Sequence, residues 1–137
     1  MNIYFAGAIR GGRDDAGIYS KLIQLLKTYG TVLTEHVGDK TLLKEEQSLS
    51  EQEIYERDMQ WLKQADVLIA EVSTPSLGVG YELAAAERLN IPCLCLFQKQ
   101  QHKTLSAMIS GNSFFQTKIY EKSSKLSIII ERFMEEL

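Results

Sequence analysis

Residues 66–86 read DVLIAEVSTPSLGVGYELAAA and contain a strand signal, a loop signal and a helix signal in direct succession. The first part, Asp66 to Val72, is a nearly continuous apolar run, which is typical of a β-strand covered on both faces. Gly78 and Gly80 follow, and the alanines from Ala84 to Ala86 indicate a helix that packs closely on a sheet. A strand, a glycine-rich loop and a helix in this order favour an α/β fold with a parallel sheet.

The same alternation extends over the chain of 137 residues. Four further strands are predicted, at residues 2–8, 31–35, 93–97 and 114–120. Helices are predicted at residues 14–30 and 50–64, after the 76–80 loop, at residues 105–110 and from Ser123, and residues 35–49 read as an irregular loop. We therefore expect one domain over residues 1–137, with a three-layer, Rossmann-like (flavodoxin-like) α/β fold whose five-stranded parallel sheet has the strand order 2-1-3-4-5.

Composition excludes several classes of function. Charged residues make up 24% of the chain and the net charge is −3, so no basic surface for a nucleic-acid polymer is expected. The apolar runs are too short to span a membrane, and Arg10 and Arg13 follow the apolar N-terminus in the wrong order for a secretory signal. Cys93 and Cys95 are expected to lie on one side of a strand as buried thiols. We expect a cytoplasmic protein, or also a nuclear one if the source is eukaryotic.

Two loops are expected to meet at one pocket. GAIRGGR, residues 7–13, follows the first strand, and STPSLGVGYE, residues 73–82, follows the third. In the order 2-1-3-4-5 these strands are neighbours at the switch point where ligands bind. Backbone N–H groups and arginines in the first loop suit a phosphate or a carboxylate; the residues concerned are Gly7, Gly11, Gly12, Arg10 and Arg13. The loop matches neither the dinucleotide motif nor the P-loop, so a turn with solvated arginines is an equal alternative.

Two carboxylates are candidates for chemistry at this pocket. Glu82 is predicted in the first turn of the helix after the second loop. The helix dipole stabilises a carboxylate there, which needs no function. The position after a strand end, however, places Glu82 in the crevice where ligands bind. Asp58 shares a helix face with Ile54, Trp61 and Leu62, and is either a boundary residue or a buried polar group. Two acidic groups at one pocket allow the division between nucleophile and acid that cleaves glycosidic bonds.

Tyr4 and His36 are weaker candidates. Tyr4 in the first strand is placed to donate a hydrogen bond to a carboxylate, although a strand tyrosine is more often a core residue. His36 ends the second strand, and a lone loop histidine is more often merely polar than catalytic. No set of three ligands accompanies His36 or His102, so we expect neither a metal nor another cofactor.

Together these motifs resemble the 2'-deoxynucleoside 5'-phosphate N-hydrolases, relatives of the nucleoside 2-deoxyribosyltransferases. The segments that carry the resemblance lie between Tyr4 and about Gly111, and read YFAGAIRGGR, GTVLTEH, ERDMQWLKQADVLIAEVSTPSLGVGYELA and LCLF…LSAMI. The C-terminal part matches only as a strand followed by a helix. The resemblance implies hydrolysis of deoxynucleoside 5'-monophosphates to a free base and 2-deoxyribose 5-phosphate, without a cofactor, by a homodimer whose active sites are shared between both chains.

The resemblance implies catalytic roles for three residues: Glu82 as nucleophile, Asp58 as the helix aspartate and Tyr4 as the strand tyrosine. Glu82 is expected to attack C1' of the deoxyribose and form a glycosyl ester, because a carboxylate stabilises positive charge on the sugar. Asp58 is the candidate proton donor to the departing base, and Tyr4 is expected to orient Glu82. A 2'-hydroxyl would crowd the site and oppose that positive charge, so deoxy substrates are expected to react faster.

The implied substrate-binding positions surround the two loops. Ser76 corresponds to a phosphate-binding serine and Ser106 to a serine that the partner subunit supplies. The full set is Gly7, Ala8, Ile9, Arg10, Gly11, Gly12, Arg13, Leu22, His36, Ile54, Ser76, Gly78, Ser106, Ala107 and Met108. Ala8 departs from the best-known members, which have serine there. A hydroxyl donor to phosphate is thereby lost, and the backbone N–H is expected to remain available.

Two other functions stay open. A nucleoside 2-deoxyribosyltransferase shares the covalent step, but it passes the sugar to a second base and needs no phosphate site. A non-catalytic nucleotide-binding module would keep the glycine loops, but it has no reason to keep Glu82 and Asp58 together. A cytokinin-type phosphoribohydrolase is excluded, because its PGGxGTxxE motif is absent from the chain. The preferred base is not specified by these motifs.

Overall fold

The computed structural model of the chain describes residues 1–9, 16–38 and 47–137. Within these residues, five strands form one sheet of order β2-β1-β3-β4-β5, in which every neighbouring pair is parallel. The strands are β1 (Asn2–Ala6), β2 (Thr31–Val32), β3 (Val67–Glu71), β4 (Cys93–Gln98) and β5 (Phe115–Tyr120). The predicted α/β class, parallel sheet and strand order are confirmed.

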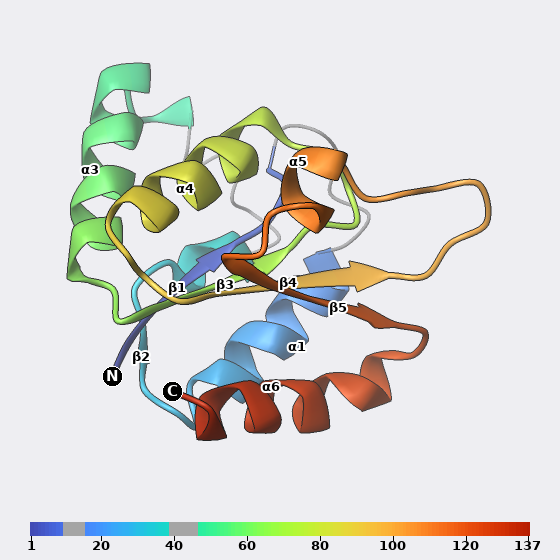
Figure 1. Cartoon of the computed structure of the whole chain (residues 1–137). Helices are drawn as coiled ribbons and strands as arrows, with labels where there is room; N and C mark the ends of the chain where they lie inside the picture. Colours follow the sequence, from blue (N-terminus) through green and yellow to red (C-terminus); the bar gives the residue numbers. More distant parts are fainter. Residues whose placement is uncertain (10–15, 39–46) are drawn as a thin grey trace.

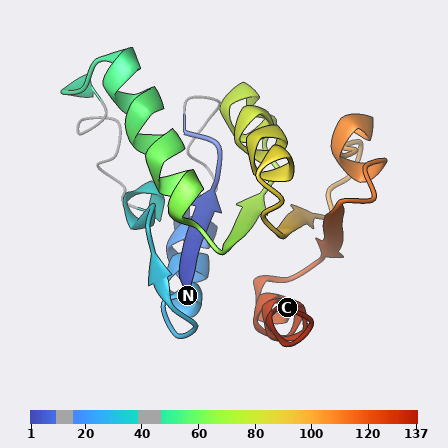
Figure 2. The same cartoon turned by 60° about the vertical axis from the view of Figure 1, so that its left-hand side comes forward.

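Helices cover both faces of this sheet (Figure 1 and Figure 2). On one side, the α3–α4 face, lie α3 (Glu51–Gln64), α4 (Leu77–Arg88) and the short α5 (Ala107–Ser110). On the other, the α1–α6 face, lie α1 (Ala16–Leu26) and α6 (Leu126–Glu135). Two 3-10 helices, η1 (Glu35–Gly38) and η2 (Ser123–Lys125), complete the described elements. Across the described ranges, no helix has the length and apolar character needed to cross a bilayer.

The strand residues alternate between two hydrophobic clusters, one on each face. Ile3 and Phe5 pack among residues of α1 and α6, whereas Tyr4 and Ala6 pack among residues of α3 and α4. This alternation follows from the two-residue period of a strand. It places the Tyr4 side chain on the α3–α4 face, and Glu82 reaches the same face from α4.

The two cysteines behave as small buried hydrophobic residues. Cys93 and Cys95 are both free thiols, and both lie in the cluster on the α3–α4 face, which confirms the prediction that they share one side of a strand. Burial raises the pKa of each thiol to about 12. Neither is therefore a thiolate nucleophile at neutral pH.

The start of α3 follows from its local sequence. Ser50 Oγ accepts a hydrogen bond from the Glu53 N–H at 3.1 Å, and Glu53 Oε1 accepts one from the Ser50 N–H at 3.1 Å. This reciprocal capping box satisfies two backbone donors without any tertiary contact. The predicted start of the helix is confirmed, and it places Asp58 about two turns further along.

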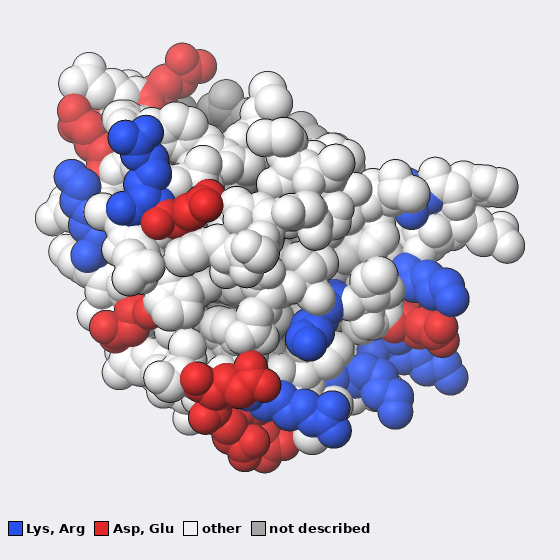
Figure 3. Space-filling view, viewed as in Figure 1, with Lys and Arg blue, Asp and Glu red and all other residues white. Residues whose placement is uncertain are grey.

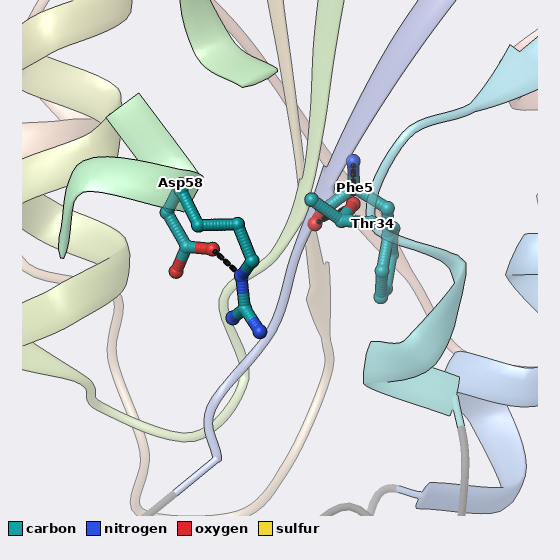
Figure 4. A network of polar contacts seen from close by, with 4 residues as sticks. Phe5, Thr34 and Asp58 are labelled. Atoms are coloured by element: carbon teal, nitrogen blue, oxygen red, sulfur yellow. Dashed lines mark hydrogen bonds and ion pairs between the residues drawn. The ribbon is translucent and has the colours of Figure 1, made fainter. Parts of the chain in front are cut away.

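The second strand is shorter than predicted, because the Thr34 side chain, and not the backbone, makes the next hydrogen bonds to β1. Thr34 is buried, and its Oγ1 accepts a hydrogen bond from the Phe5 N–H at 2.8 Å and donates one to the Phe5 carbonyl at 2.7 Å (Figure 4). The chain is thereby released from the sheet and turns into η1, which carries His36. The segment expected to be an irregular loop thus begins with a helical turn, and residues 39–46 lie outside the described ones.

Candidate active site

Three predicted catalytic side chains, Tyr4, Asp58 and Glu82, converge on the α3–α4 face. They come from β1, α3 and α4. The Tyr4 hydroxyl donates a hydrogen bond to the Glu82 carboxylate, and the negative charge of Asp58 acts on both groups. The strand order explains the meeting, because β1 and β3 are neighbours and α4 follows directly from β3.

Glu82 lies further inside its helix than the sequence indicates. The helix α4 begins at Leu77, with Ser76 as its N-cap, and Ser76 Oγ accepts a hydrogen bond from the Val79 N–H at 3.3 Å. The first turn of α4 contains no acidic residue, so Glu82 belongs to the second turn. This corrects the predicted position. It also weakens the dipole as a structural reason for a carboxylate here, because that effect falls off within the first turn.

The surroundings of Glu82 bring its titration close to neutral pH. Burial is the main reason why the pKa of Glu82 is raised to about 7; the Tyr4 hydrogen bond lowers it, and the charge of Asp58 raises it. Burial also raises the pKa of Tyr4, as do the charges of Glu82 and Asp58. Tyr4 therefore stays protonated as a donor, while Glu82 changes charge in the physiological range. Perturbed titratable groups that act on one another are candidates for catalysis.

Asp58 has a cationic partner that the sequence analysis did not single out. Asp58 Oδ1 accepts a hydrogen bond from Arg57 Nε at 2.9 Å, and this ion pair is drawn as a dashed line at Asp58 in Figure 4. The Arg57 guanidinium lies over the Trp61 ring, 4.9 Å from its centroid. The His36 ring is 5.4 Å from the same ring, which brings His36 into the neighbourhood of Asp58. The sequence signal was an arginine one residue before Asp58 and four before Trp61.

Ser76 and Gly78 lie beside Glu82. A Cβ atom placed on Gly78 would be 3.8 Å from Ser76 Oγ and 4.0 Å from Glu82 Oε1. The missing side chain therefore leaves room for a ligand next to the carboxylate. Ile54 is half-buried on α3, one turn before Asp58, at the same helix face.

The first loop has a structural role that differs from the predicted one. A Cβ atom on Gly7 would lie 2.8 Å from Tyr19 Cε2, so glycine is needed there for the Tyr19 ring to pack. The Ala8 N–H donates a hydrogen bond to the Tyr19 hydroxyl at 3.0 Å, and Ala8 is buried. This corrects the expectation that the Ala8 N–H is available to phosphate. Ile9 is half-buried against the cluster on the α1–α6 face. The remaining loop positions, Arg10, Gly11, Gly12 and Arg13, lie outside the described residues.

Leu22 is one of the substrate-binding positions that the resemblance implies, but it lies away from the carboxylates. It is buried in the cluster on the α1–α6 face, together with Phe5 and Tyr19. Tyr4 packs in the cluster on the opposite face of the sheet. The sheet thus separates Leu22 from the carboxylates. The resemblance alone implied that Leu22 binds substrate, and in the structure this apolar side chain fills the core instead.

The residues expected from a partner subunit lie on a second surface of the same chain. Ser106 is the N-cap of α5, and its Oγ accepts a hydrogen bond from the Met108 N–H at 3.3 Å. Ser106, Ala107 and Met108 are exposed. Ser76 and Ser106 both line a groove of about 620 Å³ between α4 and α5. Glu82 is not part of its lining, since the residues of α4 that line it lie on a different side of the helix.

A buried carboxylate close to the end of β3 was also not predicted. Glu71 is fully buried, and its Oε1 accepts hydrogen bonds from the Ser73 N–H at 2.9 Å and from the Ser73 hydroxyl. Ser73 Oγ in turn accepts a hydrogen bond from the Gln98 N–H at 2.7 Å. This network ties the start of the second loop to the end of β4. Its sequence signal was a single glutamate in the otherwise apolar run 67–72.

Known proteins are similar to this chain in sequence and in fold. A family described as nucleoside 2-deoxyribosyltransferase matches residues 3–130. The chain is 48% identical over 139 residues to 5-hydroxymethyl-dUMP N-hydrolase of Rattus norvegicus, covering 98% of this chain and 85% of the relative. The protein of that name from Danio rerio is 48% identical over 141 residues, covering 100% and 98%. A solved structure of Clostridium botulinum CMP N-glycosidase superposes with a TM-score of 0.69 at 17% identity, covering 97% of this chain and 99% of that one.

Proposed function

The chain belongs to the nucleoside 2-deoxyribosyltransferase family and is an N-glycosidase, and from this premise we propose that it hydrolyses 2'-deoxynucleoside 5'-monophosphates through a sugar ester on Glu82. The products are the free base and 2-deoxyribose 5-phosphate, and one domain over residues 1–137 carries the activity. Two relatives with 48% identity are named 5-hydroxymethyl-dUMP N-hydrolase, so this nucleotide is the first substrate to test. The free thiols of Cys93 and Cys95 fit a reducing compartment such as the cytoplasm or the nucleus.

The convergence of Tyr4, Asp58 and Glu82 is the observation that carries the proposal. The Glu82 carboxylate attacks C1' of the deoxyribose, and the bond between C1' and the base nitrogen breaks as the ester forms. In the reacting form the coupled pair of Asp58 and Glu82 holds one proton, on Asp58, and this proton passes to the departing base as Glu82 attacks. The negative charge of Glu82 stabilises the positive charge that develops on the sugar, and Tyr4 holds the carboxylate in place.

Water completes the reaction. It attacks C1' of the ester, the bond from C1' to the Glu82 oxygen breaks, and Glu82 leaves as a carboxylate. The water proton passes to Asp58, which regains its acid form, so the second step is the first in reverse with water in place of the base. Because Glu82 must be ionised to attack, its pKa of about 7 makes the carboxylate available at neutral pH.

The 5'-phosphate is assigned to the ends of β1 and β3. Ser76 lies at the N-terminus of α4, where a helix favours anions, and the loop after β1 contains Arg10 and Arg13. Gly78 leaves room between Ser76 and Glu82. The proposal expects monophosphates to be cleaved much faster than the matching nucleosides.

The protein is proposed to be a homodimer in which Ser106 of the partner subunit completes each site. Three large apolar side chains are exposed on α4 and α5: Leu77 at 97%, Tyr81 at 57% and Met108 at 83%. Figure 3 shows a surface without charged side chains over α5 and the neighbouring part of α4. An uncharged surface with exposed apolar side chains is a candidate interaction site. Ser76 lines the groove at this surface, which supports a site that a residue of the partner subunit completes.

The decisive experiment is Glu82→Gln, assayed with 5-hydroxymethyl-dUMP and with separation of the products. Glutamine keeps the size of the side chain and accepts a hydrogen bond from Tyr4, but it cannot form the ester. We expect turnover to fall by roughly four orders of magnitude, as when other covalent nucleophiles are removed. Glu131→Gln on α6 removes the same charge from the opposite face and should keep the wild-type rate. Near-normal turnover of a folded Glu82→Gln would exclude Glu82 as the nucleophile.

A 2-deoxyribosyltransferase is the second candidate, because the matching family is described by that activity. Both reactions share the ester on Glu82 and differ in what attacks it. Adding a second free base during turnover separates them: a transferase forms a new nucleotide or nucleoside, whereas a hydrolase releases only the sugar phosphate. A non-catalytic binding module would bind the nucleotide and release no base during long incubation.

A further inference from the structure

We propose that Arg57 is a positioning residue that holds the Asp58 carboxylate in place beside Glu82, an inference that rests on the function proposed above. Arg57 Nε–H donates to Asp58 Oδ1 at 2.9 Å. The side chains are 24% and 20% exposed, so the pair is partly shielded from water. Ion pairs in such surroundings are worth more than fully solvated surface pairs.

A second contact fixes the arginine. Its guanidinium lies over the Trp61 ring, 4.9 Å from the centroid, where a cation is attracted to the face of the ring. Trp61 packs against the hydrophobic cluster on the α3–α4 face, and the His36 ring lies 5.4 Å from it. A guanidinium held by an ion pair and by a packed ring has little freedom to move away from Asp58.

This pairing is not automatic for neighbours in a helix. Arg57 and Trp61 are four residues apart and share a helix face, whereas successive side chains of an α-helix point about 100° apart, so Arg57 has to bend toward Asp58. The bend brings its charge to the catalytic cluster: Arg57 is among the groups that lower the pKa of Tyr4, whereas burial and the charges of Glu82 and Asp58 raise it. Arg57 therefore acts on the interior of the site.

Several charged or titratable groups surround Asp58. Arg57 of the same helix, Tyr4 of β1 and Glu82 of α4 face it, and His36 of η1 lies across Trp61. Asp58 and Glu82 act on each other, so they take up protons as a coupled pair. A fixed cation beside Asp58 favours the charged form of this pair, so the pair binds its protons at lower pH than it would without Arg57. Arg57 thus sets the orientation of Asp58 and the titration of the pair.

The test measures the titration of the pair in the unliganded protein. Carbon-13 NMR of the Asp58 and Glu82 carboxyl groups is recorded against pH for wild type, Arg57→Gln and Arg57→Lys. Removing the cation should move the titration of the pair to higher pH in Arg57→Gln, and lysine should restore most of the shift because it restores the charge. Arg132→Gln, exposed on α6, removes one positive charge from the other face and should superimpose on wild type.

The second readout is turnover. Arg57→Gln should lower kcat about tenfold and leave KM within about twofold, because Arg57 contacts Asp58 and not the proposed phosphate site. Arg57→Lys should recover only part of kcat, since an ammonium lacks the planar fork that reaches both Asp58 and Trp61. An unchanged titration or an unchanged kcat in folded Arg57→Gln overturns the proposal. The titration needs no substrate, so its result stands separately if Glu82→Gln keeps its activity and the proposed function fails.

Discussion

Tyr4 of β1 donates a hydrogen bond to Glu82 of α4, and this contact links the strand and the helix that supply these two residues to the proposed reaction centre. The residues are far apart in the chain and meet because β1 and β3 are adjacent strands. The hydrogen bond lowers the pKa of Glu82, against the raising effects of burial and of Asp58. Tyr4 thus extends the pH range in which Glu82 is an ionised nucleophile.

Tyr4→Phe should move the acid limb of the pH profile of kcat/KM to higher pH. Without the phenol donor, the pKa of Glu82 rises above about 7, so less carboxylate is present at a given pH. Since a hydrogen bond to a charged group contributes about 1.5–3 kcal/mol, we expect a loss of at least roughly tenfold below neutral pH and a smaller loss above it. Tyr29→Phe makes the same change beside the other cluster and should leave the profile in place. A uniform loss at all pH values would show that Tyr4 does not act through the ionisation of Glu82.

Glu82→Gln should stabilise the folded protein, and more so at high pH. The pKa of Glu82 is about 7 in the folded protein against an ordinary value of 4.5, so between these values the folded state binds a proton that the unfolded chain has lost. The free energy of unfolding of wild type therefore falls as pH rises through this window. We expect Glu82→Gln to exceed wild type by about 2 kcal/mol near pH 8 and to approach it near pH 4, measured by denaturant unfolding. A difference independent of pH would contradict the raised pKa.

Thr34→Val should destabilise the protein, whereas Thr34→Ser should be much milder. Valine keeps the shape but removes the hydroxyl that bonds both the N–H and the carbonyl of Phe5 in a buried position. Leaving these groups unsatisfied costs about 1–3 kcal/mol of the free energy of unfolding. Serine retains the hydroxyl and serves as the control in the same denaturation experiment. Equal stability of the two variants would mean that the Thr34 hydroxyl does not replace a strand residue in solution.

Mixing two impaired chains should raise activity above the average of the two parents if the active sites are shared. A Glu82→Ala chain combined with a Ser106→Ala chain gives mixed dimers that have one intact site and one site with both changes. With random exchange, half of the dimers are mixed and half of their sites work, so activity should reach about a quarter of wild type. Both parents are measured at the same low substrate concentration, and exchange is checked by native mass spectrometry. Activity no higher than the average of the parents, with exchange verified, would place Ser106 in the site of its own chain.

Features governed by neighbouring residues could be predicted from the sequence. The capping box of Ser50 and Glu53 starts α3 where expected, because both hydrogen bonds lie within four residues. The apolar run at residues 67–72 predicts a buried strand, since a strand covered on both faces needs little else. Alternating strands and helices predict a parallel sheet, and the flavodoxin-like order expected with it is the order of the structure.

Features that depend on residues distant in the chain were decided only by the tertiary structure. Thr34 ends β2 because its hydroxyl finds Phe5, and Gly7 is required because the Tyr19 ring packs against it. The apolar spacing that includes Leu22 could not show which face of the sheet its helix covers. The sequence determined which carboxylates and glycine-rich loops are present and predicted that they meet at one crevice. Only packing decided that Tyr4 reaches Glu82, because that contact depends on where whole strands and helices settle against each other.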